Sequence, residues 1–356
     1  MHIVHIINQP NGGGAELLVR ELNQRLLNAG IESSALYLTN PRNVELGKAE
    51  YCLGLSSVRS VLAPWLLWRF IRRFSKKRVI VHAHLTYPLY YLALMPRPSS
   101  AVFLFTEHNT YNRRRSFGAL LPVERWVYSR YDAIACISEG VRESLLNWIG
   151  YANYRDRAKT ILNGARLLDF FEDRQFTSSN LTVVSLGSLT TQKGFDIGLD
   201  AVSLAGDVVG SYVVIGEGPE KESLERKAER LGPTPRLELT GWQTDIGPWL
   251  HKADILLIPS RWEGFGLVAI EALSTGLPVV ASNVAGLNEI LRDCDAAFLV
   301  EPGDPAAMAE AIRVYASKTV GEKERIARSA RDRAEMFGLD AMASSYMELY
   351  KRLGDV

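Results

Sequence analysis

The sequence has almost no net charge, few cysteines and no long apolar run. Its 41 Lys and Arg residues nearly balance 40 Asp and Glu residues, giving a formal net charge of +1, so no overall field favours nucleic acid as a partner. The three cysteines, Cys52, Cys136 and Cys294, are far apart and lack the paired spacing of zinc or redox motifs. This usage indicates a reducing, cytoplasmic compartment.

Membrane-spanning and secretory segments are not expected either. No apolar run reaches the roughly 18 residues that a transmembrane helix needs. The apolar N-terminal run ends at Asn8, too early for a signal-peptide core, and we interpret it as a buried first strand.

The 356 residues are enough for about two domains. With 47% hydrophobic and 23% charged residues, the chain can bury two cores. Strand and helix patterns alternate, which predicts an α/β fold with two parallel sheets. The expected strands of the first series are residues 3–7, 34–38, 78–82, 102–106, 133–137 and 160–162. Those of the second series are residues 182–186, 212–215, 237–239, 255–258, 278–281 and 297–300. A polar stretch between Gly164 and Leu181 without periodicity predicts a linker.

The most informative segment follows the expected strand 255–258. A turn containing Glu263, Gly264 and Gly266 leads into a helix that carries Glu271. Glycines before a helix start leave backbone N–H groups and a positive dipole end to hold a phosphate. The two carboxylates would accept hydrogen bonds from ribose and sugar hydroxyls. The alternative is that both acids only complement the helix dipole.

This segment resembles the signature of retaining glycosyltransferases of family four (glycosyl transferases group 1). Five further segments fit the same family in chain order. They are residues 12–16, 81–84, 106–109, 137–141 with 161–164, and 187–189 with Lys193 and Gly194.

The resemblance implies the GT-B fold, two doubly wound Rossmann-like domains facing a central cleft. Residues 1–170 would bind the acceptor, residues 181–339 the nucleotide-sugar donor, and a helix at 340–356 would pack back on the first domain. The implied activity is retaining transfer from a nucleotide-diphosphate sugar, with UDP as first choice, to a hydroxyl of a lipid-linked or polysaccharide precursor. The implied catalytic residues are Glu263, Lys193 and His108. The implied donor-binding residues are Gly13, Gly14, Ser188, Gly264, Phe265, Gly266, Leu267 and Glu271.

One position departs from the family pattern. Relatives usually carry arginine where this chain has Ser188, so that two cations stabilise the leaving diphosphate. Another basic residue or a divalent cation would have to replace that charge, or activity would be low. The resemblance implies that no cofactor is required, apart from a divalent cation that could replace the charge missing at Ser188.

The glycines at the first strand end leave alternatives open. Gly12, Gly13 and Gly14 fit a phosphate-approach loop, but they also fit a plain tight turn. A dinucleotide loop is disfavoured, since the full G-x-G-x-x-G spacing is lacking.

The histidines are also ambiguous. His82 and His84 would share one face of a strand, but zinc is poorly supported because no third ligand lies nearby in the sequence. A structural or acceptor-lining role is favoured. Between His108 and its neighbour Glu107 the sequence alone does not choose.

A basic aromatic segment, residues 64–78, permits two interpretations. Leu67, Phe70, Ile71 and Phe74 form an apolar stripe beside several arginines. The helix would either lie on an anionic membrane at its inner face or pack into the core with a solvated basic face. A second basic run, residues 113–115, is a candidate contact for a phosphorylated or lipid-linked acceptor.

Two rival functions remain. A sugar-nucleotide epimerase of the same fold would consume donor without an acceptor. The second rival is a protein that binds the nucleotide sugar but no longer turns it over, and the one sequence feature that favours it is Ser188.

Overall fold

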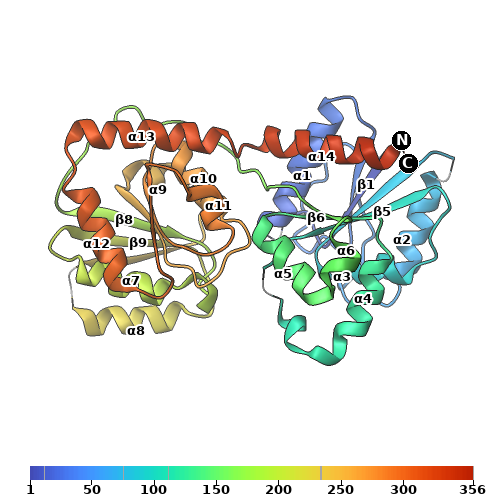
Figure 1. The fold of residues 1–356 in the computed structure, drawn as a ribbon, viewed down its shortest axis with the longest axis horizontal. Coiled ribbons are helices and arrows are strands. Elements are labelled where there is room, and N and C mark those ends of the chain that lie inside the picture. The colour runs from blue at the N-terminus through green and yellow to red at the C-terminus, as the bar shows by residue number, and fades with distance from the viewer. Residues whose placement is uncertain (12, 75, 111, 233–234, 356) are drawn as a thin grey trace. The chain divides into compact units, whose positions relative to one another are not determined.

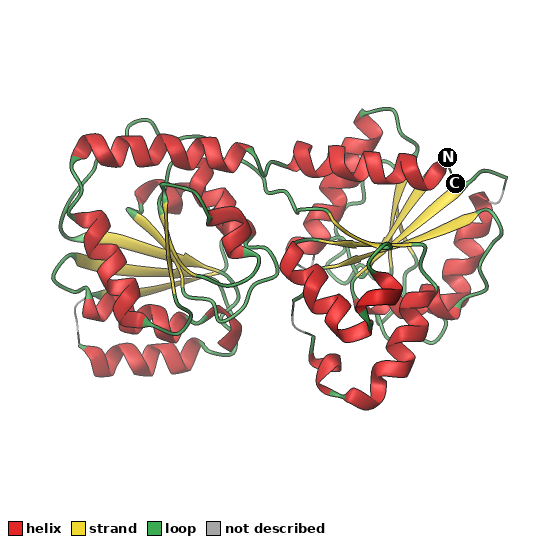
Figure 2. Ribbon diagram, in the orientation of Figure 1, coloured by secondary structure: helices red, strands yellow, loops and turns green. Residues whose placement is uncertain are grey.

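The computed structural model describes residues 1–11, 13–74, 76–110, 112–232 and 235–355. The chain divides into two compact units. Unit 1 comprises Met1–Gly164 and Leu339–Val356, and unit 2 comprises Ala165–Gly338. Each unit is a parallel sheet with helices packed on it (Figures 1 and 2).

The division falls after residue 164 rather than at residue 170, because the segment that resembles a linker packs on unit 2. The amide of Ala165 donates to Phe337 O at 2.9 Å. The guanidinium of Arg174 is buried and donates to the carbonyls of Leu250 and Thr275 at 3.4 and 3.3 Å. These bonds order a stretch that has no periodicity of its own.

Unit 1 contains a seven-stranded sheet in the order β3-β2-β1-β4-β5-β6-β7, with every pair parallel. The strands are β1 (His2–Ile7), β2 (Ser33–Tyr37), β3 (Glu50–Cys52), β4 (Val79–His84), β5 (Ala101–Glu107), β6 (Ala133–Cys136) and β7 (Ala158–Thr160). Strands β1, β2, β4 and β5 are buried along nearly their whole length, as expected for a parallel sheet covered on both faces. The strand order reverses between β1 and β4, and ligands of such sheets bind outside the carboxyl ends at such a point.

Each α-helix of unit 1 buries apolar side chains. They are α1 (Gly14–Asn28), α2 (Ala63–Ile71), α3 (Thr86–Leu94), α4 (Leu121–Ser129), α5 (Glu139–Ile149), α6 (Tyr151–Tyr154) and α14 (Leu339–Gly354), with short 3-10 turns η1 (Arg72–Phe74), η2 (Arg113–Ser116) and η3 (Gly118–Leu120). Helix α1 buries Leu18, Leu22 and Leu26, one residue per turn. The last helix, α14, lies against α1 and β4 and buries Tyr346 and Tyr350.

Unit 2 contains a six-stranded parallel sheet in the order β10-β9-β8-β11-β12-β13. Its strands are β8 (Leu181–Leu186), β9 (Val209–Ile215), β10 (Arg236–Gly241), β11 (Ile255–Ile258), β12 (Val279–Ser282) and β13 (Ala297–Val300). Its helices are α7 (Phe195–Leu204), α8 (Lys221–Leu231), α9 (Gly247–Lys252), α10 (Leu267–Ser274), α11 (Leu287–Leu291), α12 (Pro305–Ala316) and α13 (Val320–Glu335), with a 3-10 turn η4 (Thr191–Lys193). The strand order reverses between β8 and β11, which makes their carboxyl ends the candidate ligand site of this unit.

The prediction of two doubly wound α/β sheets is confirmed. Two details differ. The expected strand at residues 160–162 lies at 158–160 instead. The edge strand β3 was not predicted, because it is short and its Glu50 is held by side chains, accepting from Arg20 at 2.9 Å and from Tyr37 at 3.0 Å. Within the described residues, no helix combines the length and apolar character needed to span a bilayer.

Candidate active site

Two loops meet at the point where the strand order of unit 2 reverses. One follows β8 and runs from Gly187 through η4 to Gly194. The other follows β11 and runs from Pro259 to Gly266, where α10 begins. Since β8 and β11 are paired neighbours, their carboxyl ends bring the two loops together.

Lys193 and Glu263 join these loops. Lys193 Nζ lies 2.5 Å from Glu263 Oε1, which also accepts from Ser260 Oγ at 2.9 Å. The lysine side chain is 23% exposed and the glutamate side chain 7%. The lysine stem runs along Gly187, where an added Cβ would lie 3.2 Å from Lys193 Cε. The sequence-predicted cation and carboxylate therefore form one ion pair.

Further bonds fix the Lys193 loop against the strand end. Arg261 N donates to Gln192 O at 2.8 Å, and the Arg261 guanidinium binds both oxygens of Asp196 at 2.9 and 2.7 Å. Gly194 has φ +64°, and a Cβ there would lie 2.1 Å from Pro259 O. Only glycine allows this approach of the two backbones. The loop is thus held in place before any ligand arrives.

Helix α10 begins without a side-chain cap. Its N-cap residue Gly266 has φ +89°, and an added Cβ would lie 2.4 Å from Leu287 Cδ2. Phe265 is buried and packs edge-to-face on Phe337. The N-terminus of α10, which is the positive end of the helix dipole, therefore follows Glu263 by only a few residues.

Glu271 lies in the second turn of α10 and is partly buried. Burial raises the pKa of its carboxyl to about 7, and the positive charge of Arg166 opposes the rise. The charge state of this side chain therefore changes near neutral pH, which the sequence did not reveal.

Ser188 is exposed, and its carbonyl accepts from Thr190 N at 2.8 Å. Arg261, a basic residue of the neighbouring loop, is paired with both oxygens of Asp196.

In unit 1, His108 directly follows the carboxyl end of β5. This strand is the neighbour of β4, where the strand order reverses. Its Nε2 lies 3.5 Å from His84 Nδ1. Burial lowers the pKa of His108 to about 4, opposed by the charge of Glu107. The imidazole is therefore neutral near pH 7.

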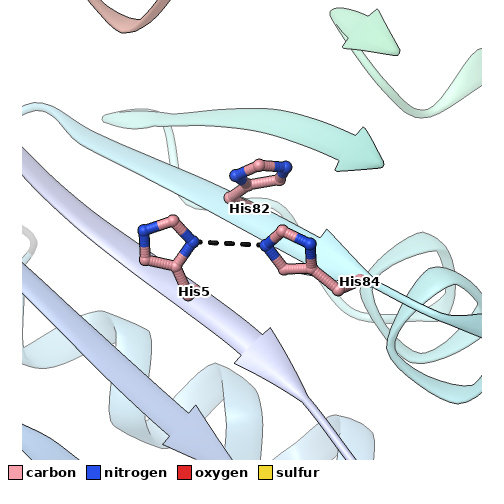
Figure 3. Close-up of side chains that lie close together, drawn as sticks. All are labelled: His5, His82 and His84. Carbon is pink, nitrogen blue, oxygen red and sulfur yellow. Dashed lines mark hydrogen bonds between the residues drawn. The ribbon is translucent and has the colours of Figure 1, made fainter. Parts of the chain in front are cut away.

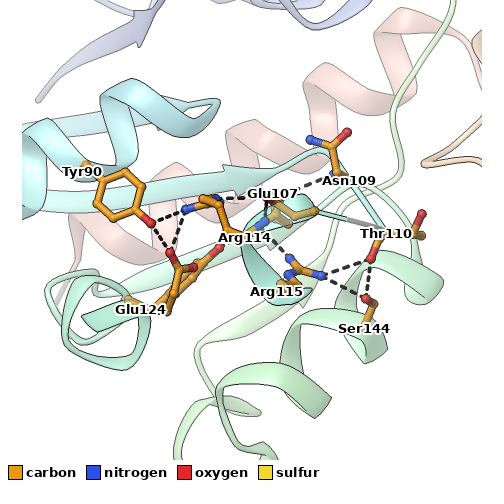
Figure 4. A network of polar contacts seen from close by, with 10 residues as sticks. Tyr90, Glu107, Asn109, Thr110, Arg114, Arg115, Glu124 and Ser144 are labelled. Atoms are coloured by element: carbon orange, nitrogen blue, oxygen red, sulfur yellow. Dashed lines mark hydrogen bonds and ion pairs between the residues drawn. The ribbon is translucent and has the colours of Figure 1, made fainter. Parts of the chain in front are cut away.

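Glu107 has a different place. It is 3% exposed and accepts from Arg115 Nη2 at 3.0 Å, Tyr128 Oη at 2.7 Å and Asn109 N at 3.3 Å. The bonds from Asn109 and Arg115 hold the loop after β5 (Figure 4), and the bond from Tyr128 connects Glu107 to α4. Glu107 is thus a support for this loop, whereas His108 keeps the position next to it.

The basic run at residues 113–115 is not a free anion-binding patch. Arg114 Nη1 binds Glu124 Oε1 at 2.9 Å and Tyr90 Oη at 2.6 Å, while Arg115 binds Glu107 (Figure 4). The side chain of Arg113 lies outside the described part of the chain. The expected contact with an acceptor phosphate therefore has no support from Arg114 and Arg115, whose charges are paired with buried carboxylates.

The loop after β1 contains Gly13 and Gly14, and Gly12 lies outside the described residues. Gly13 has φ −175°, an extended conformation open to any residue, and Gly14 starts α1. The strained residue at this edge is Leu85, with φ +66° and ψ 174° directly after β4. Such a conformation is disfavoured for leucine and tends to occur near functional sites, but no sequence signal indicates it.

The basic aromatic segment forms α2 and η1. Leu67, Phe70 and Ile71 of the expected stripe are buried, so the helix packs into the core of unit 1. Arg69, Arg72, Arg73 and Lys76 are exposed, and Ser75 lies outside the described residues. The core-packing interpretation is confirmed, and the stripe itself is not available to a membrane.

The structure is therefore that of a doubly wound α/β protein, with glycine-dependent loops, a lysine and two carboxylates at the topological switch point of unit 2, where ligands of such sheets bind. Two family models match the chain: Glycosyltransferase Family 4 over residues 12–167 and Glycosyl transferases group 1 over residues 180–317. The chain belongs to the family-four glycosyltransferases with the GT-B fold, and it is a transferase.

Curated relatives agree with this assignment. The chain is 26% identical over 364 residues to the lipopolysaccharide core biosynthesis glycosyltransferase LpsD of Rhizobium meliloti, covering 99% of this chain and 98% of that protein. It is 32% identical over 232 residues to a GDP-mannose-dependent phosphatidylinositol dimannoside mannosyltransferase of Mycobacterium tuberculosis, covering 62% of this chain and 57% of that protein.

A solved structure supports the fold. The Anabaena protein HepE, crystallised with UDP-glucose, superposes with a TM-score of 0.81 at 18% identity, covering 99% of this chain and all of that one. At this identity the likeness concerns the fold alone.

Proposed function

We propose that this chain transfers a sugar, with retention of anomeric configuration, from a UDP-sugar to a hydroxyl of a lipid-linked or polysaccharide precursor. Unit 2 (Ala165–Gly338) binds the donor and unit 1 the acceptor. The observation that carries the proposal is the Lys193–Glu263 pair at the switch point of unit 2, next to the start of α10.

The donor is held by charge and backbone. The diphosphate lies at the N-terminus of α10, where the amides of residues 264–267 and the helix dipole favour an anion. Lys193 neutralises the charge that develops on the leaving diphosphate, and it is kept in place until then by Glu263. Glu263 and Glu271 accept hydrogen bonds from sugar and ribose hydroxyls.

Catalysis in this account is electrostatic. The acceptor hydroxyl attacks on the face from which the nucleotide departs, so no side-chain nucleophile is needed. His108 of unit 1, whose imidazole is neutral because burial lowers its pKa, is the third proposed catalytic residue, and Glu107 with Arg115 holds its loop. The gain comes from positioning and from preorganised charge.

The acceptor class is supported by relatives named for lipopolysaccharide core and phosphatidylinositol mannoside synthesis. For the donor base, UDP remains the first choice from the family resemblance, while the mycobacterial relative is named for GDP-mannose, so the panel of donors should include both bases.

No metal or other cofactor is needed in this proposal, although Ser188 stands at the position of a usual arginine. Excess chelator should leave turnover unchanged, and Ser188→Arg should raise kcat/KM. If a chelator abolishes turnover and Mg²⁺ restores it, a divalent ion replaces the missing cation and this part of the proposal fails.

A peripheral contact with the inner face of an anionic membrane is also proposed. It depends on exposed residues at the start of α2 rather than on the apolar stripe, which is buried. Val61, Leu62 and Trp65 are 90%, 60% and 54% exposed, and the guanidiniums of Arg69 and Arg72 stack over Trp65 and Trp68. An apolar tip beside exposed arginines suits an anionic interface.

Vesicle sedimentation tests the membrane contact. Wild type should bind vesicles that contain phosphatidylglycerol better than neutral ones, and Trp65→Ala should bind less, while Trp242→Ala, which removes an exposed tryptophan of unit 2, should not. Equal sedimentation with both lipids would overturn the contact.

The test of the activity is product analysis with a panel of UDP-sugars and a lipid-linked acceptor. We expect acceptor-dependent release of UDP in wild type, and a loss of about 100-fold or more in Lys193→Ala. The control variant Lys227→Ala breaks an ion pair between Lys227 on α8 and Asp200 on α7, and it should release UDP like wild type. Conversion of the sugar without acceptor would show an epimerase. Tight donor binding with no conversion would show a scaffold.

A further inference from the structure

Three histidines from two strands meet in the interior of unit 1. His5 lies on β1, and His82 and His84 lie on β4 (Figure 3). The parallel register places His5 opposite His82, so all three side chains lie on one face of the sheet. They are 0%, 0% and 2% exposed. The sequence offered only two of them, 77 or more positions from the third.

Their nitrogens are close enough to share one ion. One ligand nitrogen from each ring lies within 4.8 Å of the others. His5 Nδ1 and His84 Nε2 are 3.2 Å apart (Figure 3). Two nitrogens bound to a tetrahedral zinc at about 2.0–2.1 Å would lie about 3.3 Å apart, so the existing spacing fits coordination as well as a hydrogen bond.

On His82 and His84, the nitrogens that would not bind the ion have partners of the kind that metal-bound imidazoles usually have. His82 Nδ1 lies 2.8 Å from Tyr350 Oη, and His84 Nδ1 lies 3.5 Å from His108 Nε2. Such outer contacts fix ring orientation and tautomer. His82 Nε2 now contacts Thr106 Oγ1 at 2.6 Å, but Thr106 also has Tyr346 Oη at 3.1 Å, so it keeps a partner if His82 turns to an ion.

The nitrogen of His5 that points away from His84 differs from these. Among the described residues, His5 Nε2 is buried without a hydrogen-bond partner, and an ion bound at Nδ1 would leave it so.

We propose that His5, His82 and His84 form a binding site for one zinc-type divalent transition-metal ion. The ion cross-links β1 to β4 at the centre of the unit 1 sheet, and through His82 and Tyr350 it also orders α14. Zinc suits three imidazoles and has no redox chemistry, and a fourth position remains for water. This site is separate from the donor loops of unit 2 and does not depend on the proposed transfer.

Cobalt serves as the probe, since Co²⁺ in a tetrahedral nitrogen site absorbs visible light. The tag-free full chain, washed with chelator, is titrated with Co²⁺ and then with Zn²⁺, and stoichiometry is measured by calorimetry. We expect one Co²⁺ per chain with the visible bands of a tetrahedral site, displaced by one Zn²⁺.

The variant pair uses two histidines of the same strand. His5→Gln should bind at least about 100-fold more weakly, since loss of outer partners alone costs about 10- to 100-fold. His2 lies three residues before His5 on β1, so its side chain is on the other face of the sheet, where it bonds to Ser34. His2→Gln should therefore bind like wild type. Circular dichroism establishes that both are folded.

A wild-type chain that gives no Co²⁺ bands, or binds at a stoichiometry well below one, overturns the proposal even if His5→Gln does not fold. Equal affinity in His5→Gln and wild type also overturns it. UDP-sugar binding by His5→Gln, measured in parallel, separates this result from the fate of the proposed transfer.

Discussion

Lys193 Nζ and Glu263 Oε1 lie 2.5 Å apart, although 70 residues separate them in the chain. The pair connects the loop after β8 to the loop after β11 at the reversal of strand order in unit 2. In this account the lysine is held ready for the diphosphate by the same carboxylate that contacts the sugar.

This coupling predicts non-additive effects on turnover. Lys193→Met and Glu263→Gln should each lower kcat/KM by about 10²- to 10³-fold, because each removes a group that acts in the transition state. The double variant should lose little more than the worse single one. Steady-state kinetics of the four proteins form the cycle, and the Lys227 and Asp200 pair, changed in the same way, should leave kcat/KM within about twofold. Full additivity at Lys193 and Glu263 would contradict the shared role.

Glu271 should make donor affinity depend on pH. Because burial raises its pKa to about 7, the ionised form, which accepts hydroxyl hydrogen bonds better, increases from pH 6 to pH 8. Affinity for the UDP-sugar should therefore rise over this range, by at most about tenfold per pH unit below the pKa. Calorimetric titrations at pH 6, 7 and 8 measure it, and Glu271→Gln should flatten the profile.

The raised pKa of Glu271 should also make the stability of the folded state depend on pH. The folded-state pKa lies above the ordinary value of 4.5, so the folded state binds more protons between about pH 4.5 and 7 and the contribution of Glu271 to stability declines as pH rises through that window. Glu271→Gln should accordingly gain stability relative to wild type at pH 8 but not at pH 4. A wild-type profile matched by the variant at both values would show that the side chain ionises normally.

Arg115→Ala should destabilise unit 1 strongly. It removes the partner of Glu107, with the two side chains only 10% and 3% exposed, and leaves a buried carboxylate uncompensated. The expected loss is about 3–5 kcal/mol of unfolding free energy, measured by urea denaturation. Arg352→Ala, which breaks a pair on α14 that is 77% and 73% exposed, should cost less than about 1 kcal/mol. Similar losses in both variants would mean that the buried network of Figure 4 contributes no more than a surface pair.

Gly194→Ala should be more damaging than an ordinary glycine change. At Gly194 both the φ of +64° and the 2.1 Å approach to Pro259 O oppose a Cβ, whereas Gly30 has φ +77° with open space around it. Gly30→Ala should cost about 1–2 kcal/mol for the backbone conformation alone, and Gly194→Ala clearly more, together with weaker donor binding as Lys193 is displaced. Thermal unfolding and calorimetry compare the two, and equal costs would show that the strand end yields to the methyl group.

Much of the fold could be predicted from the sequence because buried parallel strands are short apolar runs with clear ends. Residues 255–258 and 297–300 were predicted as strands to the residue. In α1, the buried Leu18, Leu22 and Leu26 recur every four residues, a spacing typical of an amphipathic helix. The strand β3 escaped because a three-residue edge strand held by Arg20 and Tyr37 has no periodicity.

The site divides along a similar line. Glu263 and Glu271 could be proposed from the turn and helix that follow the strand 255–258, and Lys193 from the family resemblance, and their roles in donor binding stay predictions. His5 could not be joined to His82 and His84 without knowing that β1 pairs with β4, since that contact depends on topology. The strain at Leu85 and the support given by Glu107 depend on packing around the backbone, which leaves no local pattern.

The central claim is that unit 2 binds a nucleotide-diphosphate sugar through α10 and its preceding loop. The most direct measurement is calorimetric titration of the full chain with UDP-glucose and a panel of other nucleotide sugars, in wild type and in folded Glu271→Ala. The account predicts saturable one-to-one binding that discriminates among the sugars and is lost in the variant. A folded wild-type chain that binds none of them would contradict it.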